Sequence, residues 1–317
     1  MHKKNIVLAK SIRIFVNTPL NYLRKKSKIW IIPGFQGLTL YEVLQHFLKG
    51  FDVPHLTERA AAISYNFIVS IPPTCLFLFT LAPNLPFVSK SGLKTELHGI
   101  IYDIVPSNTY NAGLIDFVDS FIDGSKIGLI SFTFLLSLFF ASSAVMGLMR
   151  SFNKDYIGFE TIKGLKKRWV AIKLTLMLFG LLLAYLILLL LQSNILNWIG
   201  IKDLQVKNLI LVGKWIFIIA LIFYTFAFIY KYAPSTTKRW NLVSPGAVIA
   251  TFLSILVTIG FTSFVDNFGR YNILYGSLGT IMVVMIMIFL NSLVVLIGFE
   301  FNLSIHTLKS NAEGGKV

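Results

Sequence analysis

The sequence predicts an all-α, polytopic membrane protein with six transmembrane helices and interfacial amphipathic helices. Hydrophobic residues make up 55% of the 317 residues, and charged residues only 14%. A soluble domain carries about 25% charged residues, so this composition excludes an ordinary soluble enzyme and a disordered chain. The apolar residues are also grouped into stretches of about 20, the length that crosses a bilayer as a helix.

Six such stretches can be placed along the chain. The predicted spans are about 60–81, 128–149, 169–191, 209–230, 245–264 and 278–301. They divide the chain into a basic cytoplasmic tail with an interfacial helix (1–59), a six-helix membrane domain (60–303) and a second cytoplasmic tail (304–317). The first span is the least regular, because polar residues and prolines interrupt it.

The distribution of basic residues predicts the orientation. An even number of spans puts both termini on one side, and the segments on that side hold 21 Lys and Arg against 6 on the other. Lys and Arg favour the cytoplasmic side, so we expect a multi-pass protein of the bacterial cytoplasmic (inner) membrane with both termini in the cytoplasm. The net charge of +15 is then mainly a topology signal. Membrane lipids are the expected partners, nucleic acid is not expected, and a homo-oligomer is compatible with the sequence.

Amphipathic segments flank the membrane domain. Apolar residues from Leu40 to Phe51 recur at helical spacing, and Thr39 with Glu42 suits a capping box at the start of that helix. We interpret it as an interfacial helix that anchors and orients the chain. The 82–127 loop predicts two further amphipathic helices with Asp116, Asp119 and Asp123 on one side. These acids either belong to a packed cap, which we favour, or form a cation-attracting vestibule.

The first span contains a polar and proline-rich stretch. Its candidate residues for a polar or transport pathway are Asn66, Ser70, Pro72, Pro73 and Thr74. Because proline has no N–H, the carbonyls of Ile68 and Val69 lose their helical partners, and an unpaired carbonyl must face protein or water inside a membrane. The stretch is therefore either a broken helix that lines a pathway or a kink whose carbonyls are satisfied by neighbouring hydroxyls.

The fifth and sixth spans carry small and polar residues at helical spacing. In the fifth span, small residues recur every four positions, a pattern typical of close helix packing: Gly246, Ala250, Ser254 and Thr258. In the sixth span, Asn291, Gly298 and Asn302 share one face. Glu300 lies near the cytoplasmic end and is a functional candidate by default. We prefer the alternative interpretation, in which Glu300 pairs with Arg59, Arg150 or Arg168.

The sequence contains no recognisable motif of catalysis or metal binding. The five histidines are scattered, and the one cysteine, Cys75, lies in an apolar run without partner ligands. No pattern of a zinc hydrolase, a serine hydrolase or a P-loop is present. We therefore expect no catalytic residues, no metal site and no cofactor.

Several segments together resemble the YihY/BrkB family of bacterial inner-membrane proteins, formerly labelled ribonuclease BN-like. The matching segments lie between about residues 38 and 303, and their order and spacing carry the resemblance: Ala60–Tyr65, Ser70–Pro73, Asn153, Tyr156, Lys166–Trp169, Ala233–Pro234, Trp240, Pro245–Ala247, Tyr275–Gly279 and Gly298–Asn302. The basic segment before Leu38 is less typical. The resemblance implies six helices with cytoplasmic termini. Relatives have carried a ribonuclease label or a link to serum resistance, and export of lipid or lipopolysaccharide has been suggested. The family provides no catalytic residues to carry over.

The sequence favours a non-enzymatic envelope protein that moves or organises lipid or another amphiphile. The residues to test are Asn66, Pro72, Pro73, Asn291, Glu300 and Asn302, with Ser70 and Thr74 beside them. The alternatives are an ion-coupled transporter in which Glu300 titrates, a membrane scaffold, and a ribonuclease, which is disfavoured. A pathway would gain support if Asn66, Pro72, Asn291 and Glu300 met in one internal cavity.

Overall fold

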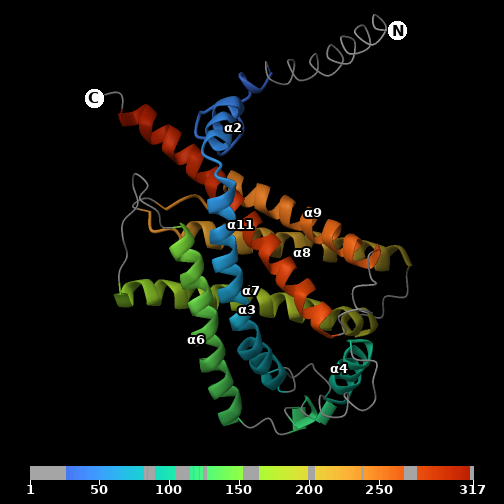
Figure 1. Ribbon diagram of the computed structural model, residues 1–317. Coiled ribbons are helices and arrows are strands. Elements are labelled where there is room, and N and C mark those ends of the chain that lie inside the picture. Colours follow the sequence, from blue (N-terminus) through green and yellow to red (C-terminus); the bar gives the residue numbers. More distant parts are fainter. Residues whose placement is uncertain are drawn as a thin grey trace, which may run out of the picture.

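The computed structural model shows a bundle of α-helices (Figure 1). It describes residues 26–81, 84, 90–104, 115–116, 118–120, 122–123, 127–152, 164–198, 204–236, 239–267 and 277–314. The helices are α2 (Leu40–Lys49), α3 (Val53–Leu81), α4 (Lys90–Ile104), α6 (Ile127–Phe152), α7 (Gly164–Trp198), α8 (Leu204–Tyr232), α9 (Pro245–Asn267) and α11 (Ser277–Gly314). The predicted all-α class is confirmed.

Six of these helices are long and apolar enough to cross a membrane, as predicted. They are α3, α6, α7, α8, α9 and α11. Several extend beyond the spans that hydropathy outlines: α3 begins at Val53, seven residues before position 60, and α11 continues to Gly314. A helix does not have to end where the hydrocarbon ends, because its backbone hydrogen bonds are internal. Much of the segment after residue 303 is therefore a continuation of α11.

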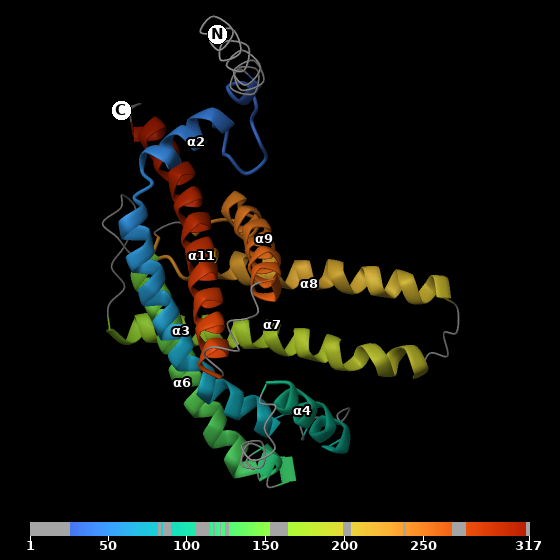
Figure 2. The same ribbon diagram turned by 45° about the vertical axis from the view of Figure 1, so that its right-hand side comes forward.

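The six long helices pack in a closed ring. In the described part of the chain, α3 packs on α6, α6 on α7, α7 on α8, α8 on α9, α9 on α11, and α11 again on α3. Figure 2 shows α7 and α8 side by side, extending away from α3 and α11. Because the six helices form a closed ring, the way in which the space between them is filled determines what the molecule can bind.

The buried core lies toward the end of the ring where α6 ends. There the rings of Phe152 and Phe299 stack with centroids 4.2 Å apart. The Tyr230 hydroxyl donates a hydrogen bond of 2.9 Å to the Val295 carbonyl, which satisfies its polar atom in the interior. Ala171 and Ala227 are completely buried and let α7 and α8 approach the same cluster.

The segment before the membrane domain packs on the C-terminal part of α11. Phe35 and Val43 form a small core with Phe301 and Ile305, so the described N-terminal segment and the end of α11 lie at the same end of the molecule. Ile29, Trp30 and Ile31 remain exposed next to Lys26 and Lys28. This mixture of apolar and basic side chains is typical of a segment at a membrane surface.

The predicted capping box of α2 is confirmed. The Thr39 backbone N–H donates to Glu42 Oε2 at 3.0 Å, and the Glu42 N–H donates to Thr39 Oγ1 at 3.4 Å. Because the carboxylate accepts hydrogen bonds from both the backbone and the side chain of Thr39, the pKa of Glu42 is lowered from its usual value of 4.5. The carboxylate also lies near the positive end of the helix dipole.

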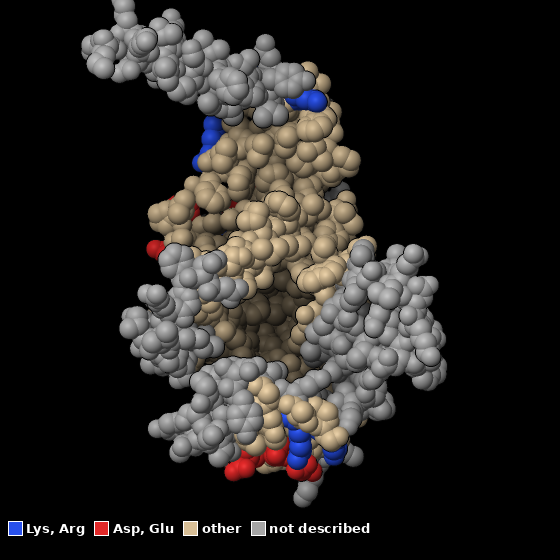
Figure 3. All heavy atoms as spheres, turned by 90° about the vertical axis from the view of Figure 1, so that its right-hand side faces the viewer, with Lys and Arg blue, Asp and Glu red and all other residues tan. Residues whose placement is uncertain are grey.

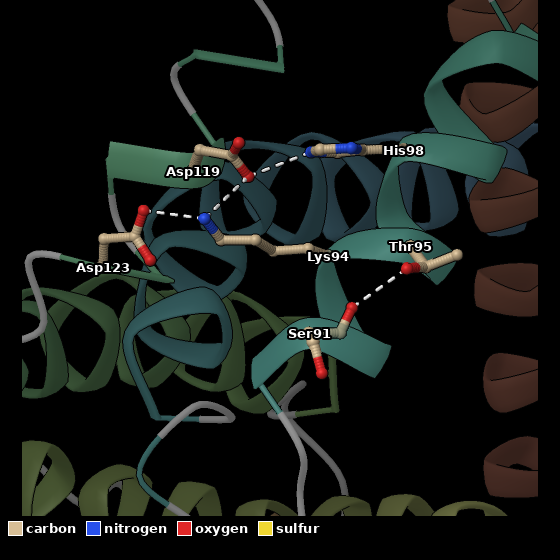
Figure 4. Close-up of polar contacts among 6 residues, drawn as sticks. All are labelled: Ser91, Lys94, Thr95, His98, Asp119 and Asp123. Atoms are coloured by element: carbon tan, nitrogen blue, oxygen red, sulfur yellow. Dashed lines mark hydrogen bonds and ion pairs between the residues drawn. The ribbon is translucent and has the colours of Figure 1, made fainter.

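At the other end of the bundle, α4 is tied to the acidic segment that follows it (Figure 4). The Lys94 ammonium lies 2.7 Å from Asp123 and 3.7 Å from Asp119, and Nε2 of His98 lies 2.9 Å from Asp119. The hydrogen bond to Asp123 raises the pKa of Lys94. Two of the three predicted acids are thus paired, while Asp116 is exposed. The sequence also predicts an apolar face beside these acids, and three of its residues, Leu114, Phe117 and Phe121, lie outside the described residues.

Candidate functional site

A cavity of about 700 Å³ lies inside the ring of long helices. Its described lining comes from α3, α6, α7 and α8, with Ile288 of α11, and comprises Phe67, Ser70, Ile71, Thr74, Cys75, Ala141, Ala144, Val145, Thr175, Leu178, Phe179, Leu181, Leu182, Tyr185, Ile218, Leu221, Ile222, Thr225, Ile229 and Ile288. None of these side chains is acidic or basic. Figure 3 shows a deep hollow in one face of the molecule, and among the described residues of its visible wall none is coloured as Lys, Arg, Asp or Glu.

The serine and threonine hydroxyl groups of the cavity wall are bonded to their own helices. Thr74 Oγ1 donates to the Ser70 carbonyl at 2.7 Å, Thr175 to the Ala171 carbonyl at 2.8 Å, and Thr225 to the Leu221 carbonyl at 2.9 Å. Because each hydroxyl proton is used within its own helix, these threonines present mainly methyl groups to the space. The cavity is therefore apolar in its chemistry as well as in its composition.

The prolines of the first span lie inside a continuous helix. Pro72 and Pro73 are part of α3, which runs without a break from Val53 to Leu81. The nearby hydroxyls of Ser70 and Thr74 donate to the carbonyls of Phe67 and Ser70. These are not the carbonyls of Ile68 and Val69 that the prolines deprive of a donor. Ser70 and Thr74 line the cavity, whereas Pro72 and Pro73 do not.

Asn66 lies between α3 and α6, outside the cavity. Its Nδ2 donates to the Ala62 carbonyl at 2.7 Å. The side chain rests on Gly147 of α6, where a Cβ would come within 2.7 Å of Asn66 Nδ2. Asn66 lines a separate pocket near the ends of α3 and α6.

The polar face of the sixth span packs against α9. Asn302 Oδ1 accepts a hydrogen bond of 2.8 Å from the Gly246 backbone, and Asn291 Oδ1 accepts one of 2.6 Å from Ser254 Oγ. A Cβ on Gly298 would lie 2.9 Å from the Cβ of Ala250, so the two helices are close there.

The small-residue ladder of α9 does not stay in this contact along its whole length. Gly246 and Ala250 are buried, Ser254 is half-buried, and Thr258 is exposed. A repeat of four residues drifts by about 40° per step around a helix of 3.6 residues per turn, which turns Thr258 away from α11.

Glu300 is held by Arg59, one of the three arginines considered from the sequence. Arg59 Nη1 donates to Glu300 Oε1 at 2.5 Å, and Nη2 donates to the Ser151 carbonyl at 2.6 Å. The two side chains are only 10% and 17% exposed. One guanidinium thus joins α3, α11 and the C-terminal end of α6, where unpaired helix carbonyls favour a cation.

The residues selected from the sequence therefore do not meet in one cavity. Ser70 and Thr74 line the apolar cavity, whereas Asn66, Asn291, Asn302 and Glu300 lie at contacts between helices. Sequence reasoning also missed most of the cavity wall, including Ala141, Tyr185 and Thr225. Their spans are apolar on all sides, so the helical period offers no signal that separates a cavity-facing residue from a lipid-facing one.

These features define a class: a six-helix membrane protein whose ring of helices surrounds an apolar cavity. Among known families, the model described as Virulence factor BrkB matches residues 47–316. The chain belongs to this family of membrane proteins. No solved structure matches it.

Relatives align with the chain over most of its length. YfkH of Bacillus subtilis, named as a ribonuclease-like protein, is 27% identical over 84% of this chain and 96% of its own length. A UPF0761 membrane protein of Haemophilus influenzae is 23% identical over 80% of this chain and 91% of its own. A UPF0761 membrane protein of Coxiella burnetii is 24% identical over 80% of this chain and 90% of its own length. The names of the last two record only that they are membrane proteins.

Proposed function

We propose that this protein moves or organises envelope lipid, or another amphiphile, by taking the apolar part of that molecule into the cavity between α3, α6, α7 and α8. The supporting observation is the cavity itself: about 700 Å³, without a charged residue in its described lining. Ligand pockets commonly have volumes of about 300–1,000 Å³ and mostly apolar walls. A cavity of this size accommodates much of a lipid chain.

The physical argument for an apolar occupant rests on contacts. A void without atoms loses the dispersion contacts that its wall could make. Water would need polar partners, and apolar cavities are generally dry. The hydroxyls of Thr74, Thr175 and Thr225 already donate to their own helices, so few donors remain for water. A hydrocarbon chain from the surrounding bilayer supplies the missing contacts without leaving a polar group unsatisfied.

The alternatives gain less support. For an ion-coupled transporter, Glu300 would need freedom to release a proton, whereas its carboxylate is paired with Arg59; it lines a separate pocket of about 160 Å³ and not the apolar cavity. A scaffold would not need the cavity. The ribonuclease-like name belongs to the Bacillus relative; in the part of this chain that the structure describes, no group of three His, Cys, Asp or Glu could hold a metal ion.

The proposal includes a location. We infer that the protein lies in the bacterial cytoplasmic membrane with both termini in the cytoplasm, because 21 Lys and Arg fall in the segments on the terminal side and 6 on the other. The relatives named above are bacterial proteins. Fusing a reporter that works only in the cytoplasm to each terminus tests this directly, and an inactive reporter at either terminus would contradict it.

The function can be tested with a matched pair of substitutions. Thr225 lines the cavity and Thr258 is exposed on α9, so Thr225→Phe fills the cavity while Thr258→Phe adds the same atoms elsewhere. In proteoliposomes that carry a lipid with a reducible fluorophore, the wild type is expected to increase the fraction of lipid exchanged between leaflets. We expect Thr225→Phe to remove most of that increase and Thr258→Phe to retain it.

Two results would argue against the proposal. One is a purified wild-type protein that adds nothing to the exchange of any lipid tested and binds none of them. The other is equal activity in Thr225→Phe and Thr258→Phe when both variants are monodisperse and melt at the wild-type temperature.

A further inference from the structure

Helix α2 has an apolar face that is wider than its contact with α11. Successive residues of a helix are turned by about 100°, and on this basis the apolar residues of α2 cover one continuous side of it: Leu40, Tyr41, Val43, Leu44, Phe47 and Leu48. Val43 is completely buried and Phe47 packs beside it toward α11. Leu44 and Leu48, in contrast, are 38% and 66% exposed. Part of the apolar face is therefore left uncovered by the rest of the chain.

The segment before α2 extends this uncovered face. The Leu40 N–H donates to the Trp30 carbonyl at 2.9 Å, and the Lys28 ammonium lies 5.1 Å from the centroid of the Tyr41 ring. These contacts hold the segment against the first turn of α2, on the side of Tyr41. Its three consecutive apolar side chains are exposed. We call the combined set the α2 surface, and it comprises Ile29, Trp30, Ile31, Leu44 and Leu48.

The α2 surface lies at the level where the membrane-spanning helices end. Phe47 of α2 contacts Phe301, with ring centroids 5.6 Å apart, and Ile249, in the second turn of α9, packs against the same small core. Phe301 is the last residue of the predicted sixth span, and Ile249 lies near the start of the fifth. Figure 2 shows α2 beside the C-terminal part of α11. An apolar side chain exposed at this depth lies next to headgroups and the upper part of the acyl chains.

The charges around the α2 surface suit an anionic membrane. Lys26 and Lys28 are exposed, and neither forms an ion pair with another described residue. No acid occurs between Lys26 and Tyr41. The one acid of α2, Glu42, is turned by about 160° from Leu44, and its carboxylate is engaged by Thr39 in the capping box. The two lysines are therefore free to attract anionic headgroups.

We propose that the α2 surface docks on the membrane itself and binds anionic lipid in the adjacent leaflet. Leu44, Leu48 and Trp30 insert among the upper acyl chains, at the depth where tryptophan is enriched in membrane proteins. Lys26 and Lys28 reach the lipid phosphates, because a lysine stem lies along apolar groups while its ammonium stays in the polar layer. This docking goes beyond the proposed function and does not depend on the apolar cavity.

The same charges argue against a second copy of the chain as the occupant. In a symmetric contact, the same surface patch of each copy faces the other, so Lys26 and Lys28 of the two copies would be brought together. Like charges that are held close together repel each other. Anionic headgroups neutralise these lysines instead, so the lipid surface is the better partner for the α2 surface.

The depth of α2 can be measured with the full-length protein in vesicles. Cys75→Ser removes the native cysteine, and a fluorophore is then attached through one of two substitutions. Leu48→Cys places it on the α2 surface, and Asn311→Cys places it on an exposed residue of α11, ten positions after Phe301. We expect nitroxide lipid to quench the probe at position 48 and aqueous iodide to quench the probe at position 311.

The preference for anionic lipid is tested with the same probe. The fluorescence lifetimes at position 48 distinguish lipid-buried from water-exposed populations, and their ratio measures docking. In vesicles that contain phosphatidylglycerol, Lys28→Gln should lower this ratio by roughly fivefold, the factor that corresponds to one cation. In vesicles of phosphatidylcholine alone, it should have little effect. Lys166→Gln removes an exposed cation of α7 instead and should leave the ratio unchanged, and melting temperatures establish that each variant is folded.

Three results would overturn the proposal. Quenching at position 48 by iodide but not by nitroxide lipid would mean that the α2 surface faces water. Quenching by neither would mean that protein covers it, either a second copy or another part of this chain. Equal losses in Lys28→Gln and Lys166→Gln would indicate a general effect of charge instead of contact at this surface. None of these measurements follows lipid exchange between leaflets, so they leave the lipid-moving function to its own test.

Discussion

Arg59 and Glu300 form a largely buried ion pair where α3, α6 and α11 meet. Their side chains are 10% and 17% exposed, and Arg59 also binds the last turn of α6 through the Ser151 carbonyl. Removing one partner of a buried pair leaves the other charge uncompensated, at a cost of about 3–5 kcal/mol. We therefore expect Glu300→Gln to lower the melting temperature of the detergent-solubilised protein strongly.

The neighbouring acid provides the control for this substitution. Glu58 precedes Arg59 in the chain and is exposed, so Glu58→Gln should change the melting temperature by no more than a degree or two. The double variant Arg59→Met with Glu300→Met removes both charges and should be more stable than Glu300→Gln. If the Glu300→Gln protein melted at the same temperature as the wild type but lost a proton-driven flux, the result would instead support the transporter alternative.

Gly246 tests how closely α9 and α11 approach. A Cβ at Gly246 would collide with the Gly298 carbonyl of the facing backbone and lie 2.6 Å from Asn302 Cγ. Since a backbone cannot turn aside as a side chain can, Gly246→Ala should force the helices apart and cost about 1–3 kcal/mol or more. Thermal unfolding measures this effect.

Gly260 lies in the same helix as Gly246 and provides a control substitution at a position where the new methyl group meets no other atom. Nothing lies within 4 Å of the position that its Cβ would take. Gly260→Ala should therefore be neutral, or more stable by up to about 1 kcal/mol through helix propensity. Equal effects of the two substitutions would mean that the close contact at Gly246 has no energetic consequence.

At the level of residues, the sequence predicts faces but not neighbours. The spacing of Asn291, Gly298 and Asn302 places them on one side of a helix, and in the structure all three lie toward α9. The same spacing could have faced a polar pathway, because a helical period contains no information about which helix lies opposite. For the same reason, the sequence does not tell which of three arginines, Arg59, Arg150 or Arg168, pairs with Glu300.

At the level of elements, the capping box of α2 has a pH dependence whose sign follows from its hydrogen bonds. The pKa of Glu42 is lowered from 4.5 because its carboxylate accepts hydrogen bonds from Thr39. The stabilisation is therefore present above pH 4.5, where the carboxylate is ionised in the folded and unfolded states, and is lost as the pH falls through the lower folded-state pKa.

Hydrogen exchange of the backbone amides 40–49 measures this dependence. We expect the protection of α2 in the wild type, relative to Glu42→Gln at the same pH, to fall as the solution is acidified below about pH 4.5. The comparison at equal pH cancels the intrinsic chemistry of exchange. Protection that changes in parallel in the two proteins would show that another group carries the effect. Thr39→Ala should cost about 1 kcal/mol near neutral pH.

The ends of the elements show what hydropathy can and cannot predict. The six apolar stretches identify six helices, because the hydrocarbon of a bilayer requires a minimum apolar length. Their ends depend on local features instead. Asp52 Oδ1 accepts a hydrogen bond from the His55 N–H at the start of α3, so α3 begins well before its apolar part. Such caps are visible in sequence only as isolated polar residues.

At the level of the whole molecule, the ring of helices and its cavity could not be predicted from the sequence. The number of spans follows from composition, and the common side of the termini follows from that number. The order of packing, from α3 through α6, α7, α8 and α9 to α11, depends on contacts between helices, and for α6, α7 and α8 the sequence offers few polar positions that would indicate which helix lies opposite. In a lipid solvent, a residue that lines a cavity is under the same demand for an apolar side chain as one that faces the bilayer.

The single cysteine gives access to the interior of this ring. Cys75 is the one cysteine of the chain and lines the cavity, so a small fluorophore on its sulfur reports what enters. If the cavity holds lipid chains, nitroxides attached to the acyl chains of the bilayer should quench this fluorophore, whereas aqueous iodide should not. Thr225→Phe should reduce the quenching by nitroxide lipid, because the ring occupies the same space.

The exposed face of α9 provides the comparison that makes this result specific. With Cys75→Ser and Thr258→Cys in one chain, the fluorophore is attached to a residue on that exposed face, and adding Thr225→Phe should leave its quenching unchanged. Strong quenching at Cys75 by iodide and none by nitroxide lipid would mean that water fills the cavity. A water-filled cavity would remove the basis for a lipid occupant.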